Sequence, residues 1–286
     1  MKNIGIIGQG FVGSAIREGL CPFYNIITYD IDTARRNCST LDEVIDAADI
    51  IFQCLPTPMK RSGECDIRLV ESSLNAINTL CQDCKAADGE NKIVVIKSTV
   101  PPGTTEMLNN KFQNIDVCFS PEFLTEANSF NDFKSQARII IGGPRPATGK
   151  IKLMFRRAFP TIPIVKTGTK TAEMVKYFTN CFLATKVIFA NEMYDMCLAV
   201  GIDMDKVCEY ALYDTRIGKS HLNVPGPDGD RGFGGHCFPK DLNAMIFFGS
   251  LNDVDTSFLD SVKRKNDAIR KNRDWESMPG RAVSED

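Results

Sequence analysis

A short apolar run followed at once by a glycine-rich turn is the feature that most constrains the fold of this chain. Residues 2–7 are typical of a buried strand, the turn Gly-Gln-Gly-Phe-Val-Gly follows directly, and residues 14–20 are helical in composition. In this strand–turn–helix setting Gly8 makes the tight turn, Gly10 lets a ligand approach the backbone, and Gly13 lets the helix pack against the strand. The pattern predicts a doubly wound α/β domain that holds a dinucleotide pyrophosphate at the helix N-terminus.

The next apolar run, residues 25–29, ends at an acidic residue. Asp30 stands where a dinucleotide-binding domain holds the ribose hydroxyls of its cofactor. A carboxylate at this place would repel a 2′-phosphate, so the expected cofactor is NAD and not NADP.

Strand-like runs alternate with helical patterns through the first half of the chain. Further strands are expected over residues 50–55, 92–96, 117–119, 138–141 and 162–165, and helices over residues 41–47 and 69–80. This alternation predicts a parallel sheet whose ligands bind beyond the carboxyl ends of the strands. The loops 56–58, 98–102 and 120–123 follow predicted strands and should face the cofactor, although proline and hydroxyl residues are also ordinary turn formers.

From about residue 169 the pattern becomes helical only. Residues 172–200 contain no proline or glycine and are expected to form one long helix. Glu173, Lys176 and Asn180 share one face of it, although on spacing alone such a stripe is more typical of a solvated surface than of a site. The opposite face carries apolar side chains that we expect to be buried, in a subunit interface: Val175, Phe178, Phe182 and Val187.

A second glycine-rich segment, residues 232–241, places a cysteine where a turn meets a helix. Pro239 suits the first helical position, and an apolar run supplies the helix body. The helix N-terminus and Lys240 would both favour the thiolate of Cys237, the form that attacks a carbonyl carbon. Asp241 could orient a water or the thiol. The alternative interpretation is a buried, unreactive cysteine in a glycine turn.

Composition limits the class of protein. The chain has 286 residues and a formal net charge of −2, which suits about two globular domains and offers no basic footprint for nucleic acid. No apolar stretch reaches the roughly 18 residues that span a membrane, and we expect a cytoplasmic protein. The eleven cysteines are scattered and odd in number, unlike a disulfide framework. Cys81 and Cys84 form an isolated pair at the end of a predicted helix, so we expect no metal site.

Seven motifs occur in the order found in one enzyme family. They are the glycine turn at 8–13, Leu-Pro-Thr-Pro at 55–58, Lys-Ser-Thr-Val-Pro at 97–101, Ser-Pro-Glu-Phe-Leu at 120–124, Ala-Glu-Met-Val-Lys at 172–176 with Asn180, Arg-Ile-Gly at 216–218, and residues 232–241. Through these motifs the sequence resembles the nucleotide-sugar 6-dehydrogenases of the UDP-glucose/GDP-mannose dehydrogenase family, and most closely the UDP-glucose 6-dehydrogenases. The resemblance implies a Rossmann-like doubly wound sheet followed by an all-α dimerisation domain built on the long helix.

The resemblance also implies an activity. In that family a cysteine, here Cys237, is the nucleophile of a four-electron oxidation that uses two NAD. A primary alcohol becomes a carboxylate through a thiohemiacetal and a thioester. Lys176 and Asn180 match the residues that steady the oxyanion at C6 of the sugar.

Further roles follow from the same resemblance. Glu122 matches the base in thioester hydrolysis, and Asp241 and Thr99 would hold the water or tune the proton path. The residues that match cofactor positions are Gly8, Gly10, Phe11, Val12, Gly13, Asp30, Arg35, Thr57, Thr99, Glu126 and Lys240. The residues that match substrate positions are Glu122, Phe123, Leu124, Lys176, Asn180, Arg216 and Gly234. Arg216 matches an arginine that reaches into the neighbouring subunit's site, which implies a homodimer.

Members of the family usually continue with a second α/β domain that closes over the nucleotide, whereas this sequence ends in a short polar tail. We expect an NAD-binding domain over residues 1–168, a helical domain over residues 169–270, and a frayed tail over residues 271–286 that holds Trp275. The sequence does not decide whether the nucleotide-sugar substrate is UDP-glucose, GDP-mannose or UDP-N-acetylmannosamine. A non-catalytic NAD-binding regulatory subunit is the second hypothesis, while a simple β-hydroxyacid dehydrogenase would not need the Cys237 thiol.

Overall fold

The structure, a computed structural model, describes residues 3–285. The chain divides into two compact units. Unit 1 comprises Met1–Thr57 and Ile67–Lys176, and unit 2 comprises Pro58–Asp66 and Tyr177–Asp286. The short segment Pro58–Asp66 therefore belongs to unit 2, although the chain on both sides of it belongs to unit 1.

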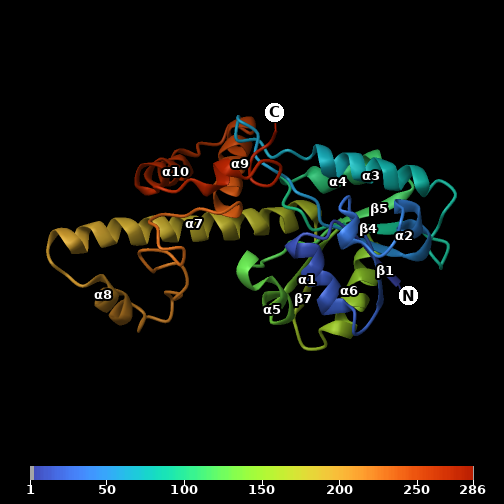
Figure 1. Ribbon diagram of the computed structural model, residues 1–286, viewed down its shortest axis with the longest axis horizontal. Helices are drawn as coiled ribbons and strands as arrows, with labels where there is room; N and C mark the ends of the chain where they lie inside the picture. Colours follow the sequence, from blue (N-terminus) through green and yellow to red (C-terminus); the bar gives the residue numbers. More distant parts are fainter. Residues whose placement is uncertain (1–2, 286) are drawn as a thin grey trace. The chain divides into compact units, whose positions relative to one another are not determined.

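Unit 1 is built on a seven-stranded sheet with the strand order β2-β1-β3-β4-β5-β6-β7 (Figure 1). The strands are β1 (Asn3–Ile7), β2 (Asn25–Tyr29), β3 (Ile50–Gln53), β4 (Lys92–Ile96), β5 (Ile115–Phe119), β6 (Ile139–Gly142) and β7 (Ile164–Thr167). Neighbouring strands run parallel except β5 and β6, which pair antiparallel through Phe119 and Gly142. The doubly wound, mostly parallel sheet confirms the predicted fold class.

The antiparallel pairing of β5 and β6 is the one departure from the parallel strand direction that the sequence predicts. A parallel neighbour needs a crossover that carries the chain back along the strand. Between β5 and β6 the chain forms only η2 (Glu126–Asn128) and the six-residue helix α5 (Ser129–Lys134). The chain starts β6 from the end at which β5 finishes, so the two strands run in opposite directions.

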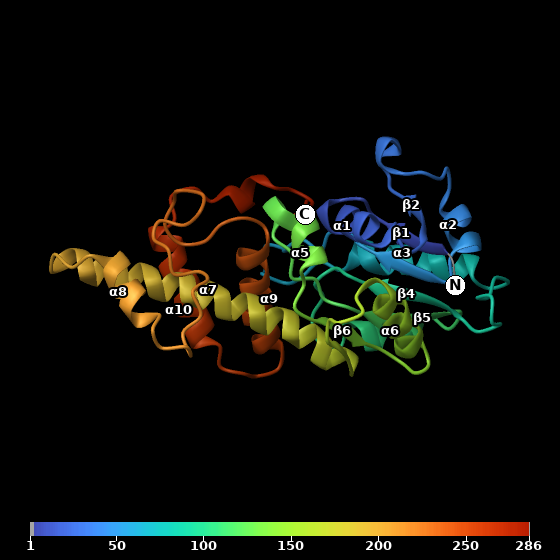
Figure 2. The ribbon, with the colours of Figure 1, turned by 90° about the horizontal axis from the view of Figure 1, so that it is seen from below.

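Helices cover both faces of this sheet and give it two apolar cores. The helices that pack on one face are α1 (Phe11–Leu20), α5 and α6 (Ala147–Ala158), and those on the other are α2 (Leu41–Ala47), α3 (Arg68–Leu80) and α4 (Thr104–Lys111) (Figures 1 and 2). Strand β3 shows the alternation, because Ile50 and Phe52 belong to the first core and Ile51 to the second. A sheet buried on both faces explains why its strands are continuous apolar runs.

Unit 2 is helical, as its sequence predicts. Its helices are α8 (Met204–Ala211), α9 (Cys237–Leu251) and α10 (Ser257–Ile269), together with most of the 31-residue helix α7 (Thr169–Ala199), which begins in unit 1. Ala184 and Ile188 of α7 pack with Leu242 of α9 and Val262 of α10 in one buried cluster. In this unit α9 and α10 lie along one side of α7 (Figure 1).

Of the four apolar side chains of α7 that were expected in a subunit interface, Val175 and Val187 are partly buried within the chain, whereas Phe178 and Phe182 are exposed. These side chains are 70% and 56% exposed, and Phe189 and Met196 are 61% and 54% exposed. The four residues lie on the same side of the helix, because their spacings of 4, 7 and 7 residues keep them close to one line along it. Unit 2 therefore presents a stripe of large apolar side chains to solvent.

The prediction of a frayed tail is wrong. Trp275 is 5% exposed and lies in the short 3₁₀ helix η3 (Asp274–Ser277). Further along, the N–H of Met59 donates to Ala282 and the N–H of Ser284 donates back to Met59, both at 2.8 Å. The tail is ordered because it buries an indole ring and pairs its backbone with the segment Pro58–Asp66.

Within residues 3–285 no helix is long and apolar enough to cross a membrane. The same residues contain no group of three or more His, Cys, Asp or Glu side chains that could hold a metal ion.

Candidate active site

The glycine turn after β1 has no room for side chains at two of its three glycines. Gly8 has a φ of +88°, and a Cβ there would lie 2.4 Å from the carbonyl oxygen of Cys54. A Cβ on Gly13 would lie 1.9 Å from the carbonyl oxygen of Gly8, whereas a Cβ on Gly10 would meet open space. A phosphate can therefore approach the backbone at Gly10, next to the N-terminus of α1. These residues fit the pyrophosphate of a dinucleotide.

Asp30 follows β2 and holds the same turn. Its Oδ2 accepts a hydrogen bond from the N–H of Gln9 at 2.6 Å, and its Oδ1 accepts one from the N–H of Asp32 at 2.8 Å. The carboxylate thus fastens the glycine turn to the end of β2, in addition to its predicted role toward a ribose. Arg35 lies next to it in η1 (Thr33–Arg35) and pairs with Asp32 at 3.0 Å. The other cofactor residues predicted for unit 1 are partly or fully exposed at the starts of α1 and η2: Phe11, Val12 and Glu126.

Two of the predicted strand-end loops are hydrogen-bonded to each other. The hydroxyl of Thr57 donates to the carbonyl of Thr99 at 2.8 Å, and the hydroxyl of Ser98 donates to the carbonyl of Leu55 at 2.5 Å. Thr57, Ser98 and Thr99 are all buried. The carboxyl ends of β3 and β4 therefore form one connected edge, which is where an open α/β sheet binds its ligands.

Glu122 and Lys176 form a buried ion pair beside the third loop. Lys176 Nζ lies 2.9 Å from Glu122 Oε1, and the side chains are 4% and 9% exposed. The N–H of Leu124 donates to Glu122 Oε2 at 2.7 Å, and Lys176 also lies over the ring of Phe123. Burial alone would raise the pKa of Glu122, but the Lys176 ammonium and the Leu124 amide outweigh it and lower the pKa. The carboxyl group is thus held ionised.

The polar stripe of α7 is buried and is not a solvated surface. Glu173, Lys176 and Asn180 are 0%, 3% and 5% exposed. Glu173 accepts hydrogen bonds from the N–H groups of Gly103 and Thr105 at 2.6 and 2.7 Å, so it caps the N-terminus of α4. Lys176 and Asn180 are one helical turn apart and share one face of the helix.

In unit 2 the side chain of Asn180 meets the start of α9. Asn180 Nδ2 donates to Asp241 Oδ2 at 2.5 Å, and Lys240 Nζ forms an ion pair with Asp241 Oδ1. Both members of that pair are buried. Burial would lower the pKa of Lys240, but the adjacent Asp241 carboxylate more than offsets it and raises the pKa. Lys240 is therefore a fixed cation in this unit, paired with Asp241.

Cys237 is the first residue of α9 and is half-buried. The turn before it requires glycine at position 235 because of its backbone conformation and at position 234 because of the lack of space. Gly235 has a φ of +70°, and a Cβ on Gly234 would lie 2.3 Å from a guanidinium nitrogen of Arg270 and 2.5 Å from Asp274 Oδ1. The sequence therefore holds the thiol at a helix N-terminus, where free N–H groups favour the thiolate.

Comparison with known proteins identifies the family. Residues 24–158 match the NAD-binding domain, and residues 170–268 the central domain, of the UDP-glucose/GDP-mannose dehydrogenase family. The chain belongs to this family. UDP-glucose 6-dehydrogenase of Rickettsia bellii is 35% identical over 235 residues, which are 80% of this chain and 51% of that protein. UDP-glucose 6-dehydrogenase TuaD of Bacillus subtilis is 29% identical over 307 residues, which are 94% of this chain and 64% of that protein.

A solved structure of a family member has the same fold. The UDP-glucose dehydrogenase of Pyrobaculum islandicum superposes with a TM-score of 0.81 at 28% identity, covering 94% of this chain and 68% of that one. The chain thus spans about half to two thirds of the length of these relatives. It contains the NAD-binding and central domains of a UDP-glucose/GDP-mannose dehydrogenase.

In this dehydrogenase-family chain Arg216, which the resemblance assigns to a neighbouring subunit's site, lies on the surface. Its side chain is 88% exposed. Its guanidinium forms a forked contact with the carboxylate of Asp214, with distances of 2.9, 3.1 and 2.6 Å. The residue is therefore presented to solvent on unit 2.

Lys97, in the family motif at residues 97–101, is a buried cation to which the sequence alone assigned no role. Lys97 is 6% exposed and follows β4 directly. Its Nζ donates to Ser120 Oγ at 3.3 Å and to the carbonyl of Pro121 at 3.0 Å. A lysine at the end of the apolar run 92–96 was the available signal, because lysine is almost never fully buried unless it is paired.

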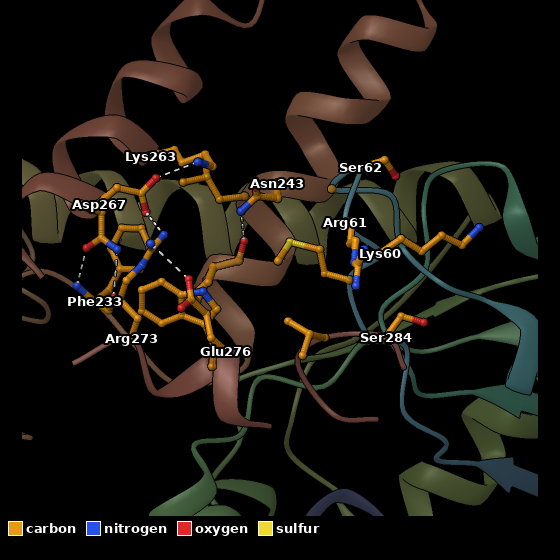
Figure 3. Close-up of a pocket in the computed structure, with 17 residues that line it drawn as sticks. Lys60, Arg61, Ser62, Phe233, Asn243, Lys263, Asp267, Arg273, Glu276 and Ser284 are labelled. Atoms are coloured by element: carbon orange, nitrogen blue, oxygen red, sulfur yellow. Dashed lines mark hydrogen bonds and ion pairs between the residues drawn. The ribbon is translucent and has the colours of Figure 1, made fainter. Parts of the chain in front are cut away.

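Unit 2 of this dehydrogenase-family chain also contains a cavity of about 620 Å³ (Figure 3). It lies between the segment Pro58–Asp66, α9, α10 and the C-terminal tail. Pro239 and Asn243 line it from α9, on the opposite side of that helix from Asp241. The cavity therefore does not lie on the face of α9 that Asn180 contacts.

Two of the four cationic side chains that line this cavity, Lys263 and Arg273, are paired with carboxylates of the same wall. Lys263 pairs with Asp267 at 2.7 Å, and Arg273 pairs with Asp267 at 2.9 Å and with Glu276 at 3.2 Å (Figure 3). Cations held by carboxylates of the same wall attract an anionic ligand weakly. The cavity thus differs in chemistry from the glycine turn of unit 1.

Proposed function

We propose that this chain oxidises the C6 alcohol of a nucleotide-sugar to the carboxylate with NAD, and that the substrate is UDP-glucose and the product UDP-glucuronate. The observation that carries the proposal is the start of α9, where half-buried Cys237 precedes the Lys240–Asp241 pair contacted by Asn180. The names of the relatives favour UDP-glucose. GDP-mannose and UDP-N-acetylmannosamine are the alternatives.

The thiol of Cys237 is assigned the covalent chemistry. Loss of a hydride from C6 and of the hydroxyl proton gives an aldehyde, and NAD supplies the hydride acceptor at this and the later oxidation. The thiolate then attacks the carbonyl carbon, a C–S bond forms, and the oxygen takes up a proton to give a thiohemiacetal. Loss of a second hydride and of that proton gives a thioester. Water attacks the thioester, the C–S bond breaks, and the carboxylate and the thiolate are released.

The buried polar groups on α7 suit the other steps. The Lys176 ammonium and the Asn180 amide share one helix face and can both donate to an oxyanion at C6. Glu122 is held ionised by Lys176, so it can accept a proton from the attacking water. Thr99 and Asp241 are assigned to the water and the proton path. Gly8, Gly10, Gly13 and Asp30 are assigned to the cofactor.

The proposal is tested by supplying the purified chain with NAD and each of the three nucleotide-sugars in turn. The measurement is the number of NADH molecules formed per sugar consumed, together with the identity of the product. Two NADH per UDP-glucose, with UDP-glucuronate as the product, are expected. One NADH per sugar would mean a two-electron oxidation, and NAD binding without turnover on any of the sugars would favour a non-catalytic NAD-binding subunit.

We also propose that two copies of the chain pair through α7. Phe178, Phe182, Phe189 and Met196 form an exposed apolar stripe on the helix. Stripes of this kind on a long helix mark interaction sites, because isolated soluble chains seldom expose so many large apolar side chains together. In such a dimer Arg216 would be available to the partner's site.

A further inference from the structure

Lys97 is a buried cation that the proposed mechanism does not use. It stands directly after β4, and its Nζ donates to the hydroxyl of Ser120 and to the carbonyl of Pro121. Both acceptors are uncharged oxygens, and both belong to the turn that leads from β5 to Glu122. Burying an ammonium group against neutral acceptors is costly unless a nearby charge compensates it.

The hydrogen bond to Pro121 acts on Glu122 through the backbone. The carbonyl of Pro121 and the N–H and Cα of Glu122 belong to one planar peptide unit. A donor that fixes the direction of this carbonyl therefore fixes the N–Cα bond of Glu122, and this leaves rotation about that bond as the only backbone freedom between the carbonyl and the side chain. The turn is held from the other side as well, because the N–H of Ser120 donates to Ile96 at 3.0 Å.

Four ionisable groups in unit 1 act on one another around this turn. They are Lys97, Cys54, Glu122 and Lys176. Burial lowers the pKa of Lys97 to about 8, although Cys54 and Glu122 both oppose this effect. Burial raises the pKa of the Cys54 thiol to about 12, so this group is neutral at physiological pH. Glu122 is thus the anion of the group, and Lys176 and Lys97 are its two cations.

We propose that Lys97 is the positioning residue of Glu122: its hydrogen bonds to Pro121 and Ser120 aim the carboxylate, and its charge is the second one that keeps the carboxylate ionised. Lys176 makes the direct ion pair with Glu122, whereas Lys97 acts on Glu122 through its hydrogen bonds to Ser120 and Pro121. The inference rests on the proposed function only for the use that catalysis makes of Glu122. The geometry itself predicts an effect on Glu122 in the ligand-free chain.

The test compares the pKa of the Glu122 carboxyl group in the ligand-free wild-type chain and in Lys97→Met. Carbon-13-labelled glutamate side chains are titrated by NMR, and Glu122→Gln identifies the resonance. The methionine side chain retains the apolar stem and removes the charge and the donor. We expect the pKa of Glu122 to be higher in Lys97→Met, because one of its two cations is gone. An unchanged pKa overturns the proposal, whether or not any sugar is oxidised.

Lys92→Met is the matched control. Lys92 is a buried lysine at the other end of β4, and its Nζ donates to the carbonyl of Ala48 at 3.1 Å, beyond the end of α2. Lys92→Met should lower the stability of unit 1 and leave the pKa of Glu122 unchanged. An equal rise of that pKa in both variants would show general loosening of the sheet and would refute a specific role for Lys97.

Lys97→Arg keeps a positive charge and donors and should return the pKa of Glu122 toward the wild-type value. If Lys97→Met does not fold, Lys97→Arg alone tests whether Lys97 acts on the pKa of Glu122. In the wild type the Glu122 resonance should shift near pH 8 as Lys97 loses its proton, since Lys97 has a pKa of about 8. Arginine stays protonated there, so this shift should be absent from Lys97→Arg, and its persistence overturns the proposal.

Kinetics adds a separate readout once sugar oxidation has been measured. Lys97→Met should lower kcat by roughly tenfold or more, because small displacements of a catalytic group are expensive. KM for NAD should change less than kcat, since Lys97 donates to Ser120 and Pro121 and does not belong to the glycine turn. A kcat of Lys97→Met equal to that of the wild type would show that catalysis does not depend on how Lys97 orients the Glu122 carboxylate.

Discussion

The cysteines of this chain differ in what their surroundings allow. Burial raises the pKa of Cys54 and of Cys181 to about 12, and it raises the pKa of Cys118 further, so these thiols stay protonated. Cys237 is half-buried and begins α9. A half-buried thiol at the start of a helix is suited to form the thiolate that attacks a carbonyl, whereas a deeply buried thiol is not.

Substitution of this one thiol should therefore separate chemistry from binding. Cys237→Ala should abolish formation of the sugar acid and leave NAD affinity unchanged, as measured by product analysis and by calorimetry. Cys208→Ala is the control, because Cys208 is also half-buried in unit 2 but lies inside α8 and not at its start. Sugar acid produced by Cys237→Ala at the wild-type rate would eliminate the covalent scheme.

At the scale of helices and strands, the sequence predicts elements that depend on local periodicity. It does not predict strand direction or contacts between segments far apart in the chain. The strand–glycine–helix unit at residues 3–20 and the long helix α7 follow from local periodicity, and the structure has them close to the predicted positions. The direction of β6 depends on the path of residues 120–138, which the apolar run 138–141 does not encode. The membership of Pro58–Asp66 in unit 2 depends on contacts such as that of Ser284 with Asp66 at 2.8 Å.

The same limit applies to the candidate site. Motifs identified Glu122, Lys176, Asn180 and Asp241 as members of a site, and the structure pairs Glu122 with Lys176 and Asn180 with Asp241. Which side chain of a motif meets which partner depends on rotamers and packing across different elements. That is why Lys97 remained without a role until its contacts with Ser120 and Pro121 were seen.

The capping of α4 by Glu173 of α7 should contribute measurably to the free energy of unfolding. Glu173→Ala leaves the buried N–H groups of Gly103 and Thr105 without their acceptor, which should cost about 1–3 kcal/mol in the free energy of unfolding. Burial raises the pKa of Glu173. A raised pKa in the folded state means that the native chain binds more protons than the unfolded chain. The advantage of the wild type over Glu173→Ala should therefore be greatest at acidic pH and decline as pH rises through the raised pKa.

Urea titrations at several pH values supply the measurement. The control is Glu106→Ala, which removes a solvent-exposed partner of Lys170 on the same helix α4. Exposed pairs contribute little, so this variant should unfold close to the wild type at neutral pH. A Glu173→Ala midpoint that coincides with that of Glu106→Ala would contradict the capping role.

At the scale of the whole molecule, the exposed stripe on α7 predicts how copies of the chain associate. Phe182→Glu places a charge in the middle of the stripe and should convert a dimer into a monomer, because a buried unpaired carboxylate is costly. Sedimentation at micromolar concentration measures the change. Leu153→Glu is the control, since Leu153 is 74% exposed on α6 and lies outside the stripe. A wild-type chain that sediments as a monomer would refute the pairing.

The buried indole of the tail gives the two units different optical signals. Trp275 is the only tryptophan of the chain, lies in unit 2, and has the guanidinium of Arg273 5.4 Å from the centre of its ring. Tryptophan fluorescence therefore reports the unfolding of unit 2 alone, whereas far-ultraviolet circular dichroism sums the helices and strands of both units. Coincident denaturation curves from the two signals would mean that the units unfold together, and separate curves would give each unit its own stability.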